Sequence, residues 1–502
     1  MNRFNLLFTS LLFTAASFGQ KSYTPSVEYC DCAFKVDSSF LQLVQPQYRP
    51  DYVFQLRADS TLSTRCGYLF VPENRQKKNS RMIKLPFIIT SNKNNANRQP
   101  DPVLFTSGGP GNSSLSWING QTAKLLSADR DCIAFEQRGT RFAIPHLRTL
   151  LLDSVMRVAY RKNLPKDSMW MVGVKLYKKE LIRKSIDINA YNTDATVQDI
   201  GDLVKALHID SINLFGGSYS GGLVTAVAQQ FPGKVRSLVL DSPLPTFSPV
   251  DEDEHRHFIE ALHVLSERAK RDSVSPKYAN VEQQFHAYFK KIIDSVFILH
   301  MTDPVTQEPL AVEYTRVELL DIIVNAILDR SQLKAVPDII LDITSGNHEK
   351  YVLPKIKRKF TANTHPDGMR MLVYCADATG YHDEKVIAQM FQLYPYLEGY
   401  HINDVWKPVC DCWANPSISP ETKKHFYSAI PMLVADGAMD AACSPRYMLE
   451  LKHYFINAQA FLFTNMSHGV GSATFASMMQ QFLNDPLKPV AFKDEHVVLM
   501  ER

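Results

Sequence analysis

The chain has 502 residues, of which 45% are hydrophobic and 21% are charged. This length and apolar content suffice for one large domain with an insertion, or for two or three domains. Lysine plus arginine (55) nearly balance aspartate plus glutamate (52), and no long run of one charge occurs, so the sequence favours neither a nucleic-acid partner nor binding to an anionic membrane surface.

Residues 1–19 have the pattern of an export signal. Arg3 supplies a positive start, an apolar run covers 6–16, and Ser17-Phe18-Gly19 offers small residues for cleavage. The apolar run is too short to span a bilayer, and no other stretch reaches that length. We therefore expect an exported chain, periplasmic or extracellular, without a membrane span.

Export makes the cysteines interpretable as disulfide partners. The chain has eight: Cys30, Cys32, Cys66, Cys132, Cys375, Cys410, Cys412 and Cys443. Zinc is disfavoured, because the close pairs lack the usual two-residue spacer and an accompanying pair of histidines. We expect one bridge from Cys30 or Cys32 to Cys66, and another from Cys375 to Cys410 or Cys412. Cys132 lies within an apolar strand and is expected to be a buried free thiol.

The first part of the chain alternates short apolar strands with loops. Strands are expected near 66–72, at 82–90 and at 103–106, and the last of these opens into a glycine-rich loop, Ser107 to Ser114. A loop of this kind directly after a core strand exposes backbone N–H groups, which an acyl-transfer enzyme needs where an oxyanion forms.

The next strand, 132–136, ends in Glu136-Gln137-Arg138-Gly139-Thr140-Arg141. Arg138 could bind an anion, but an arginine in such a turn more often ties neighbouring loops together through several hydrogen bonds, and we favour that structural role. A mostly helical insertion is expected over 149–189.

A strand, a small-residue turn and a helix then follow one another. Ile212 to Phe215 is apolar, Gly216-Gly217-Ser218-Tyr219-Ser220 forms the turn, and 223–230 has a helical pattern. This is the context of a nucleophile elbow, whose motif is Gly-x-Ser-x-Gly. Ser220 replaces the second glycine, and a rival register would make Ser220 the nucleophile. We favour Ser218, because it follows the strand most directly.

The alternation of strand and helix predicts an α/β fold with a mostly parallel, doubly wound sheet. It stops after a strand at 237–240, and amphipathic helices are expected near 255–268, 317–328 and 385–397. We expect a core whose first part covers 20–245, an inserted helical cap domain at 246–428, and the rest of the core at 429–502.

The resumed core places an acid and a base after successive strands. Asp440 follows an apolar strand at 431–435, and His468 follows the last strand, 460–464. Together with Ser218 they give the order serine, aspartate, histidine of the α/β-hydrolase triad. In such a triad the histidine takes the proton of the serine, and the aspartate fixes the tautomer of the histidine.

These residues resemble the proline iminopeptidase and tripeptidyl aminopeptidase group of α/β-hydrolase serine exopeptidases. The matching stretches are the Gly108-Gly109-Pro110-Gly111 loop, the Glu136-to-Thr140 turn, the Gly216-to-Tyr219 elbow, and the segments 437–440 and 467–469. Glu136 stands where the family has aspartate, and Ser220 where it has glycine. The segments around Cys375 and Cys410 also look like the tripeptidyl aminopeptidase branch.

The resemblance implies an α/β-hydrolase fold and hydrolysis of peptides from their free N-terminus, with catalytic residues Ser218, Asp440 and His468. The N–H groups of Gly109 and Tyr219 would form the oxyanion hole, and no metal or cofactor would be needed. Recognition of a substrate ammonium calls for carboxylates in the cap, and the candidates are the acidic run 251–254, in particular Glu252 and Glu254, and Asp377. The alternative for the acidic run is a solvated helix start, which the helix dipole favours. The alternatives are an esterase or amidase on the same scaffold and a non-catalytic binding protein that has kept the fold.

Overall fold

The computed structural model describes residues 23–96, 98–273, 275–362, 368–378 and 380–501. The expected export signal at 1–19 lies outside these residues. Among the helices that are described, none is both long enough and apolar enough to cross a membrane.

A ten-stranded sheet forms the centre of the molecule, in the order β1-β2-β3-β5-β4-β6-β7-β10-β11-β12. The strands are β1 (Ser26–Cys30), β2 (Leu62–Pro72), β3 (Met82–Asn92), β4 (Gln99–Thr106), β5 (Arg130–Phe135), β6 (Ile212–Gly217), β7 (Val235–Asp241), β10 (Met432–Gly437), β11 (Ala458–Phe463) and β12 (Val497–Leu499). Six strands that are consecutive in the sheet are mutually parallel, namely β5, β4, β6, β7, β10 and β11. The strands on either side of them pair antiparallel. The mostly parallel sheet expected from the sequence is therefore present.

Helices cover both faces of the sheet. Successive side chains of a strand point to opposite faces, and those of the central strands are apolar on both, so each face needs a covering layer. Leu214 of β6 packs in the core cluster that holds α5 (Thr193–Ala206) and α6 (Tyr219–Gln230). Its neighbour Phe215 packs in the other cluster, with α17 (Ala473–Asn484) and α2 (Gln121–Leu126). Because the parallel strands all end at one edge, the loops that follow them meet there.

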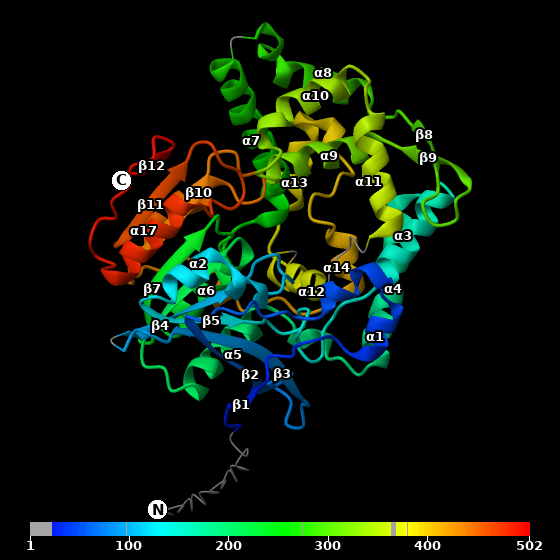
Figure 1. Cartoon of the computed structure of the whole chain (residues 1–502). Helices are drawn as coiled ribbons and strands as arrows, with labels where there is room; N and C mark the ends of the chain where they lie inside the picture. Colours follow the sequence, from blue (N-terminus) through cyan, green and yellow to red (C-terminus); the bar gives the residue numbers. More distant parts are fainter. Residues whose placement is uncertain (1–22, 97, 274, 363–367, 379, 502) are drawn as a thin grey trace, which may run out of the picture.

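A largely helical layer lies above that edge in the view of Figure 1. It is made of α7 (Val250–Asp272), α8 (Val281–Lys291), α9 (Arg316–Leu328), α10 (Val336–Thr344), α11 (Glu349–Thr361), α12 (Gly368–Asp377), α13 (Glu384–Leu393), α14 (Lys407–Trp413) and α15 (Pro420–Lys423). A hairpin of β8 (Phe297–Thr302) and β9 (Pro309–Tyr314), which the sequence analysis did not predict, belongs to this layer. It buries alternate residues such as Leu299 and Val312.

Two helices from the first part of the chain also join this layer. They are α3 (Leu151–Arg161) and α4 (Lys166–Arg183), and they lie beside α11 and α14 at the right of Figure 1. Arg157 of α3 donates to the carbonyl of Lys359, and Lys178 of α4 donates to that of Trp413. The cap in space therefore draws on residues before 246. The remaining helices are α1 (Ser38–Leu43) at the N-terminal side and α16 (Pro445–Tyr454) between β10 and β11.

Two disulfides decide between the pairings that the sequence left open. Cys32 bridges to Cys66, and Cys375 bridges to Cys410, with Cα atoms 5.1 and 5.0 Å apart. The first ties the N-terminal segment to β2, and the second ties α12 to α14. Cys132 is a buried free thiol, as expected from its strand.

Candidate active site

Ser218 lies in the sharp turn between β6 and α6. Its φ of 56° and ψ of −133° are strained for a residue with a side chain. Gly108 and Gly216 make this turn possible, because a Cβ on Gly216 would lie 2.3 Å from the Ser220 carbonyl oxygen, and one on Gly108 would lie 2.8 Å from the Cβ of Ser218. This is the geometry of a nucleophile elbow, which presents one hydroxyl above the end of the strand.

Ser220 serves the elbow from inside. Its side chain is completely buried, its hydroxyl donates to the carbonyl of Thr106 at 2.7 Å, and it accepts the N–H of Gly217 at 2.9 Å. The serine that replaces the motif glycine therefore pins the turn to the neighbouring strand β4. It does not reach the cleft, and this geometry favours Ser218 as the nucleophile.

Asp440 and His468 meet at the same edge, because they follow the adjacent strands β10 and β11. Nδ1 of His468 donates to Oδ2 of Asp440 at 2.7 Å. The other carboxylate oxygen accepts the N–H groups of Ala442 and Cys443, each at 2.8 Å. Burial alone would raise the pKa of Asp440, but the imidazole and these N–H groups outweigh it and hold the pKa below its usual value.

The interaction between Asp440 and His468 shifts the pKa of the histidine in the opposite direction. Burial disfavours the imidazolium, but the carboxylate of Asp440 outweighs this effect and raises the pKa of His468 well above its usual value. Because Nδ1 is held by Asp440, the other ring nitrogen, Nε2, is the atom that can accept a proton. The pair therefore has the polarity of a triad's base and orienting acid.

Cys443 is a neighbour that the sequence analysis did not single out. Its buried thiol lies 3.9 Å from the hydroxyl of Ser218 and also hydrogen-bonds the ring of His468. In the described part of the chain the hydroxyl of Ser218 has this thiol, and not the imidazole, as its side-chain partner. Hydrogen bonds between catalytic groups are often long until substrate is bound. In the sequence, the signal that could have identified Cys443 as a neighbour of the site is its position three residues after Asp440.

Asp241 and Ser242, at the end of β7, hold the serine and histidine segments together. The backbone carbonyl of Asp241 accepts the N–H of Ser218 at 3.0 Å. Its carboxylate accepts the N–H of Val470 at 2.7 Å, and the Ser242 hydroxyl accepts that of Gly469 at 2.9 Å. The loop that carries His468 is thus fixed relative to the elbow through one strand end.

The glycine-rich loop after β4 lies against the elbow. The buried carboxylate of Glu136 accepts the N–H of Ser114 at 2.8 Å, and Gln137 donates to the carbonyl of Ser107 at 2.7 Å. Gly109 has a φ of +120°, which favours glycine. Among the described residues, neither the N–H of Gly109 nor that of Tyr219 donates to a side chain or to a loop carbonyl, as the predicted oxyanion donors require.

Arg138, in the same turn, has a structural role. Its buried guanidinium binds both carboxylate oxygens of Asp199 at 2.7 Å and donates to the carbonyls of Glu73 and Ala190. It therefore joins three segments below the site, as the sequence analysis favoured.

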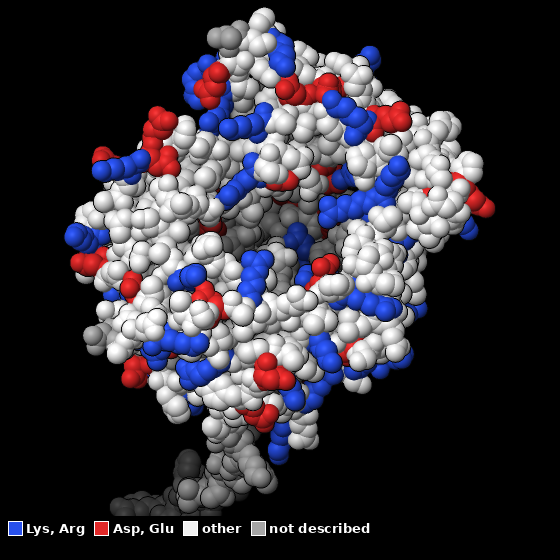
Figure 2. All heavy atoms as spheres, viewed as in Figure 1, with Lys and Arg blue, Asp and Glu red and all other residues white. Residues whose placement is uncertain are grey.

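A cleft of about 740 Å³ contains Ser218 and His468. Figure 2 shows it as the hollow in the face of the molecule. Its core side is aromatic: Phe105 stacks on Trp117 with ring centroids 4.5 Å apart, and Phe215 lies beside both. Its cap side is polar and carries Glu254, Arg370, Tyr374, Asn403 and Asp404. The cleft thus combines an apolar wall from the core with a polar wall from the cap that carries two carboxylates and one guanidinium.

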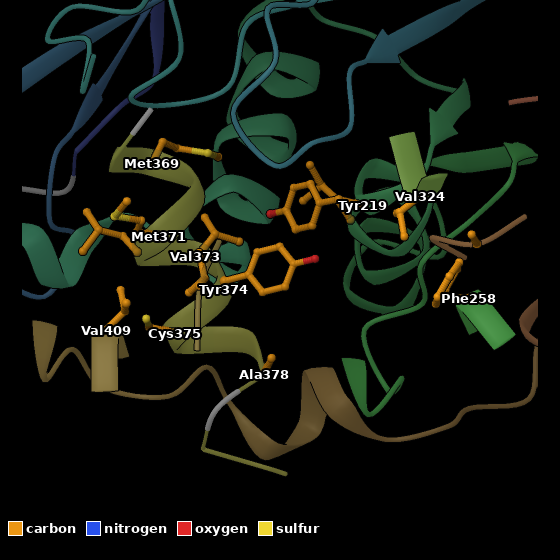
Figure 3. Close-up of a cluster of buried hydrophobic side chains, with 14 of the residues drawn as sticks. Tyr219, Phe258, Val324, Met369, Met371, Val373, Tyr374, Cys375, Ala378 and Val409 are labelled. Carbon is orange, nitrogen blue, oxygen red and sulfur yellow. The ribbon is translucent and has the colours of Figure 1, made fainter. Parts of the chain in front are cut away.

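The three carboxylates predicted from the sequence take different positions. Glu254 of α7 lines the cleft, whereas Glu252 accepts the N–H of Asp383 on the outside of the cap and does not line it. Asp377 lies behind the elbow in a separate cavity of about 30 Å³, where α12 packs against Tyr219 (Figure 3). One of the three, Glu254, therefore lines the cleft that contains Ser218, together with Asp404, which no sequence pattern marked.

Glu254 is held in a largely buried, acidic environment. Its side chain is 14% exposed, and Nδ2 of Asn403 donates to its Oε2 at 2.6 Å. Burial raises the pKa of Glu254 well above its usual value, and the nearby carboxylates Asp251 and Asp404 raise it further, while the Asn403 amide and the Arg370 guanidinium oppose the shift without cancelling it. A cation that enters the cleft would relieve this repulsion. Among the described residues no three histidine, cysteine or acidic side chains are grouped to hold a metal ion.

Comparisons with known proteins agree with this architecture. Residues 101–260 match the family model of the α/β-hydrolase fold, and residues 395–495 match the model of TAP-like proteins. No curated protein matches the chain.

Several solved structures are similar to it at low identity. A serine hydrolase from Cycloclasticus zankles is 14% identical, over 84% of this chain and 98% of that one, with a TM-score of 0.35. The corresponding values are 14%, 83%, 97% and 0.35 for proline iminopeptidase from Mycobacterium smegmatis, and 14%, 83%, 100% and 0.36 for a bromoperoxidase from Bacillus anthracis. The strand order, the elbow and the matched segments establish that the chain has the α/β-hydrolase fold.

Proposed function

We propose that this chain is a serine hydrolase that removes residues from the free N-terminus of peptides through an acyl-enzyme on Ser218. The observation that carries the proposal is the cleft itself. It is lined by the elbow serine, by His468, which is bound from behind by Asp440, and by a largely buried carboxylate, Glu254. A serine hydrolase needs the first three groups, and recognition of an ammonium needs the fourth.

In the proposed reaction the hydroxyl of Ser218 turns from Cys443 toward His468 and attacks the scissile carbonyl. Nε2 of His468 takes the proton and returns it to the departing amine, while Asp440 stabilises the imidazolium. The N–H groups of Gly109 and Tyr219 bind the oxyanion, and each such donor contributes about 3–4 kcal/mol to lowering the barrier. Water, activated by His468, then releases the acyl group and regenerates Ser218.

Recognition of the substrate N-terminus is proposed to use Glu254 together with Asp404. Both line the cap side of the cleft, and the charge of an ammonium offsets the repulsion between the carboxylates. A blocked, neutral N-terminus would leave Glu254 with Arg370 as its nearby cation and would not offset the repulsion from Asp251 and Asp404. We do not assign Glu252 to this site, because it faces the outside of the cap. Asp377 is not assigned to it either, because it lies behind the elbow in a separate cavity.

Export is proposed on two grounds, namely the signal-like pattern at 1–19 and the two disulfides. Disulfides form and persist in oxidising compartments. The mature chain would then meet its peptides in the periplasm or outside the cell.

Chromogenic amides test the proposal directly. Aminoacyl and tripeptidyl amides with free N-termini should release their chromophore, and the acetylated forms should not. Ser218→Ala should abolish the reaction, with a loss of roughly 10⁶-fold in kcat. Equal cleavage of blocked and free forms would favour an esterase or amidase instead, to which the aromatic wall of the cleft would offer an apolar acyl site. Activity that survives in Ser218→Ala but disappears in Ser220→Ala would reverse the assignment of the nucleophile.

A further inference from the structure

Arg370 connects the cap to the oxyanion loop. It lies on α12 and lines the cleft, and its Nη1 donates to the backbone carbonyl of Gly109 at 2.5 Å. Gly109 has no side chain by which the fold could hold it. It adopts a φ of +120°, which a glycine reaches without strain because it has no Cβ. A guanidinium on its carbonyl therefore restrains the peptide group directly after the one that carries the Gly109 N–H, and through the shared Cα it limits the orientation of that donor.

The other end of the guanidinium leads to Glu254. Nη2 of Arg370 donates to Oδ1 of Asn403 at 3.1 Å, and the Tyr374 hydroxyl donates to the same oxygen at 3.0 Å. Two donors on that oxygen fix the orientation of the amide, so Nδ2 of Asn403 points to Oε2 of Glu254 at 2.6 Å. The guanidinium also lies over the ring of Tyr374, with its Cζ 4.8 Å from the centroid.

These contacts form one continuous series from the cap carboxylate to the oxyanion loop: Glu254, Asn403, Arg370 and Gly109. The groups come from four segments, namely α7, the loop before α14, α12 and the loop after β4. A shift of Glu254 toward an incoming cation moves the carboxylate to which Nδ2 of Asn403 donates, and the Asn403 amide moves with it. Arg370 binds both Asn403 and Gly109, so its planar guanidinium transmits that movement to Gly109.

We propose that Arg370 is a positioning residue that couples binding of the substrate N-terminus at Glu254 to the geometry of the oxyanion loop. The inference rests on the proposed function and extends it, because the free N-terminus then raises kcat as well as affinity. Binding energy from a part of the substrate remote from the reacting bond is converted into catalysis in this way.

The test compares two substrates in the full chain, a peptide amide with a free N-terminus and its des-amino analogue. In the wild type the free N-terminus should give the higher kcat. Arg370→Met should lower kcat for the free form by roughly 10- to 100-fold, less than the 10²- to 10³-fold loss of an oxyanion donor itself. The analogue should lose much less, so the ratio of the two kcat values should fall toward one.

Arg316→Met is the matched control for damage to the cap. Arg316 also donates to three backbone carbonyls, those of Ile293, Tyr396 and Glu398, but all of them lie within the cap and away from the cleft. Its kcat ratio should stay at the wild-type value. Arg370→Lys provides a second variant that keeps the charge but cannot span both acceptors, and its ratio should also fall. Added guanidinium should partly restore the ratio in Arg370→Ala.

Three results would overturn the coupling: an unchanged kcat in Arg370→Met, an equal loss for both substrates, or a rise in KM alone. The proposed function fails separately, when the wild type cleaves neither free peptide amides nor their analogues, or cleaves both equally well. Melting temperatures of the variants show whether a lost activity is a lost fold.

Discussion

The thiol of Cys443 lies 3.9 Å from the hydroxyl of Ser218, and it also contacts the ring of His468. It therefore lies beside both of the groups between which a proton must pass in an acyl transfer. Burial raises the pKa of this thiol, so it remains protonated at neutral pH and acts as a weak hydrogen-bond donor. Any group added to Cys443 would separate the serine from its base.

A small thiol-modifying reagent such as methyl methanethiosulfonate should therefore inactivate the enzyme once it enters the cleft. Cys443→Ala should keep activity and resist the reagent. Cys412→Ala removes another free thiol, which lies on α14 in the cap, and should remain sensitive. Inactivation of Cys443→Ala at the wild-type rate would show that the sensitive group lies elsewhere. The measurement is residual activity against time of exposure.

Asp440→Asn should lower kcat by about 10⁴-fold, because an amide no longer fixes the tautomer of the imidazole. The carboxylate is also what raises the pKa of His468 against the effect of burial. Its removal should lower that pKa, so the acidic limb of the kcat–pH profile should move to lower pH even though the maximum falls. A limb that stays in place would mean that it reports a group other than His468.

Glu254→Gln tests the ammonium site through pH. The carboxylate must be ionised to bind an ammonium, and burial with nearby acids raises its pKa. In the wild type, kcat/KM for free N-termini should thus rise with the loss of a proton from Glu254 as well as from His468, whereas for a substrate without an amine it should rise with the loss from His468 alone. It should fall again as the substrate amine loses its charge near its pKa of about 8.

In Glu254→Gln the rising limb of Glu254 should disappear, and kcat/KM for free N-termini should fall by roughly 10²-fold, as expected when one partner of a buried charge pair is removed. The substrate without an amine provides the internal control, since it reports His468 in both proteins. If both substrates lose activity equally, Glu254 has no special role toward the N-terminus.

Much of the core could be predicted because its signals are local. Apolar runs mark β4, β6, β10 and β11, and the residues after them, among them Ser218, Asp440 and His468, are brought together by parallel strands that end at one edge. No local sequence pattern of this kind predicts which residues of the cap meet. Arg370, Asn403 and Glu254 meet only because helices far apart in sequence pack together, and the pattern around each is that of an ordinary amphipathic helix or loop. The hairpin β8–β9 was missed for the same reason, since its alternation is short and half exposed.

Asp377 was expected to bind substrate, but its position predicts an effect on stability instead. Burial raises the pKa of its carboxyl to about 7, although Thr193 donates to it and the buried Lys423 lies close by. The folded chain therefore retains a proton that the unfolded chain releases near pH 4. The stabilisation of the protonated form is complete below about pH 4 and is lost as the pH rises toward 7, by up to ~4 kcal/mol.

Asp377→Asn removes this titration, because an amide can accept the bond from Thr193 at every pH. The decrease in melting temperature between pH 5 and pH 8 should then be smaller in this variant than in the wild type. Asp411→Asn, at a side chain that is 62% exposed on α14, is the matched control and should follow the wild type. An unchanged decrease in Asp377→Asn would mean that the carboxyl is ionised throughout this range. Lys423 would then neutralise it in place, and the segment behind Tyr219 would be held by an ion pair.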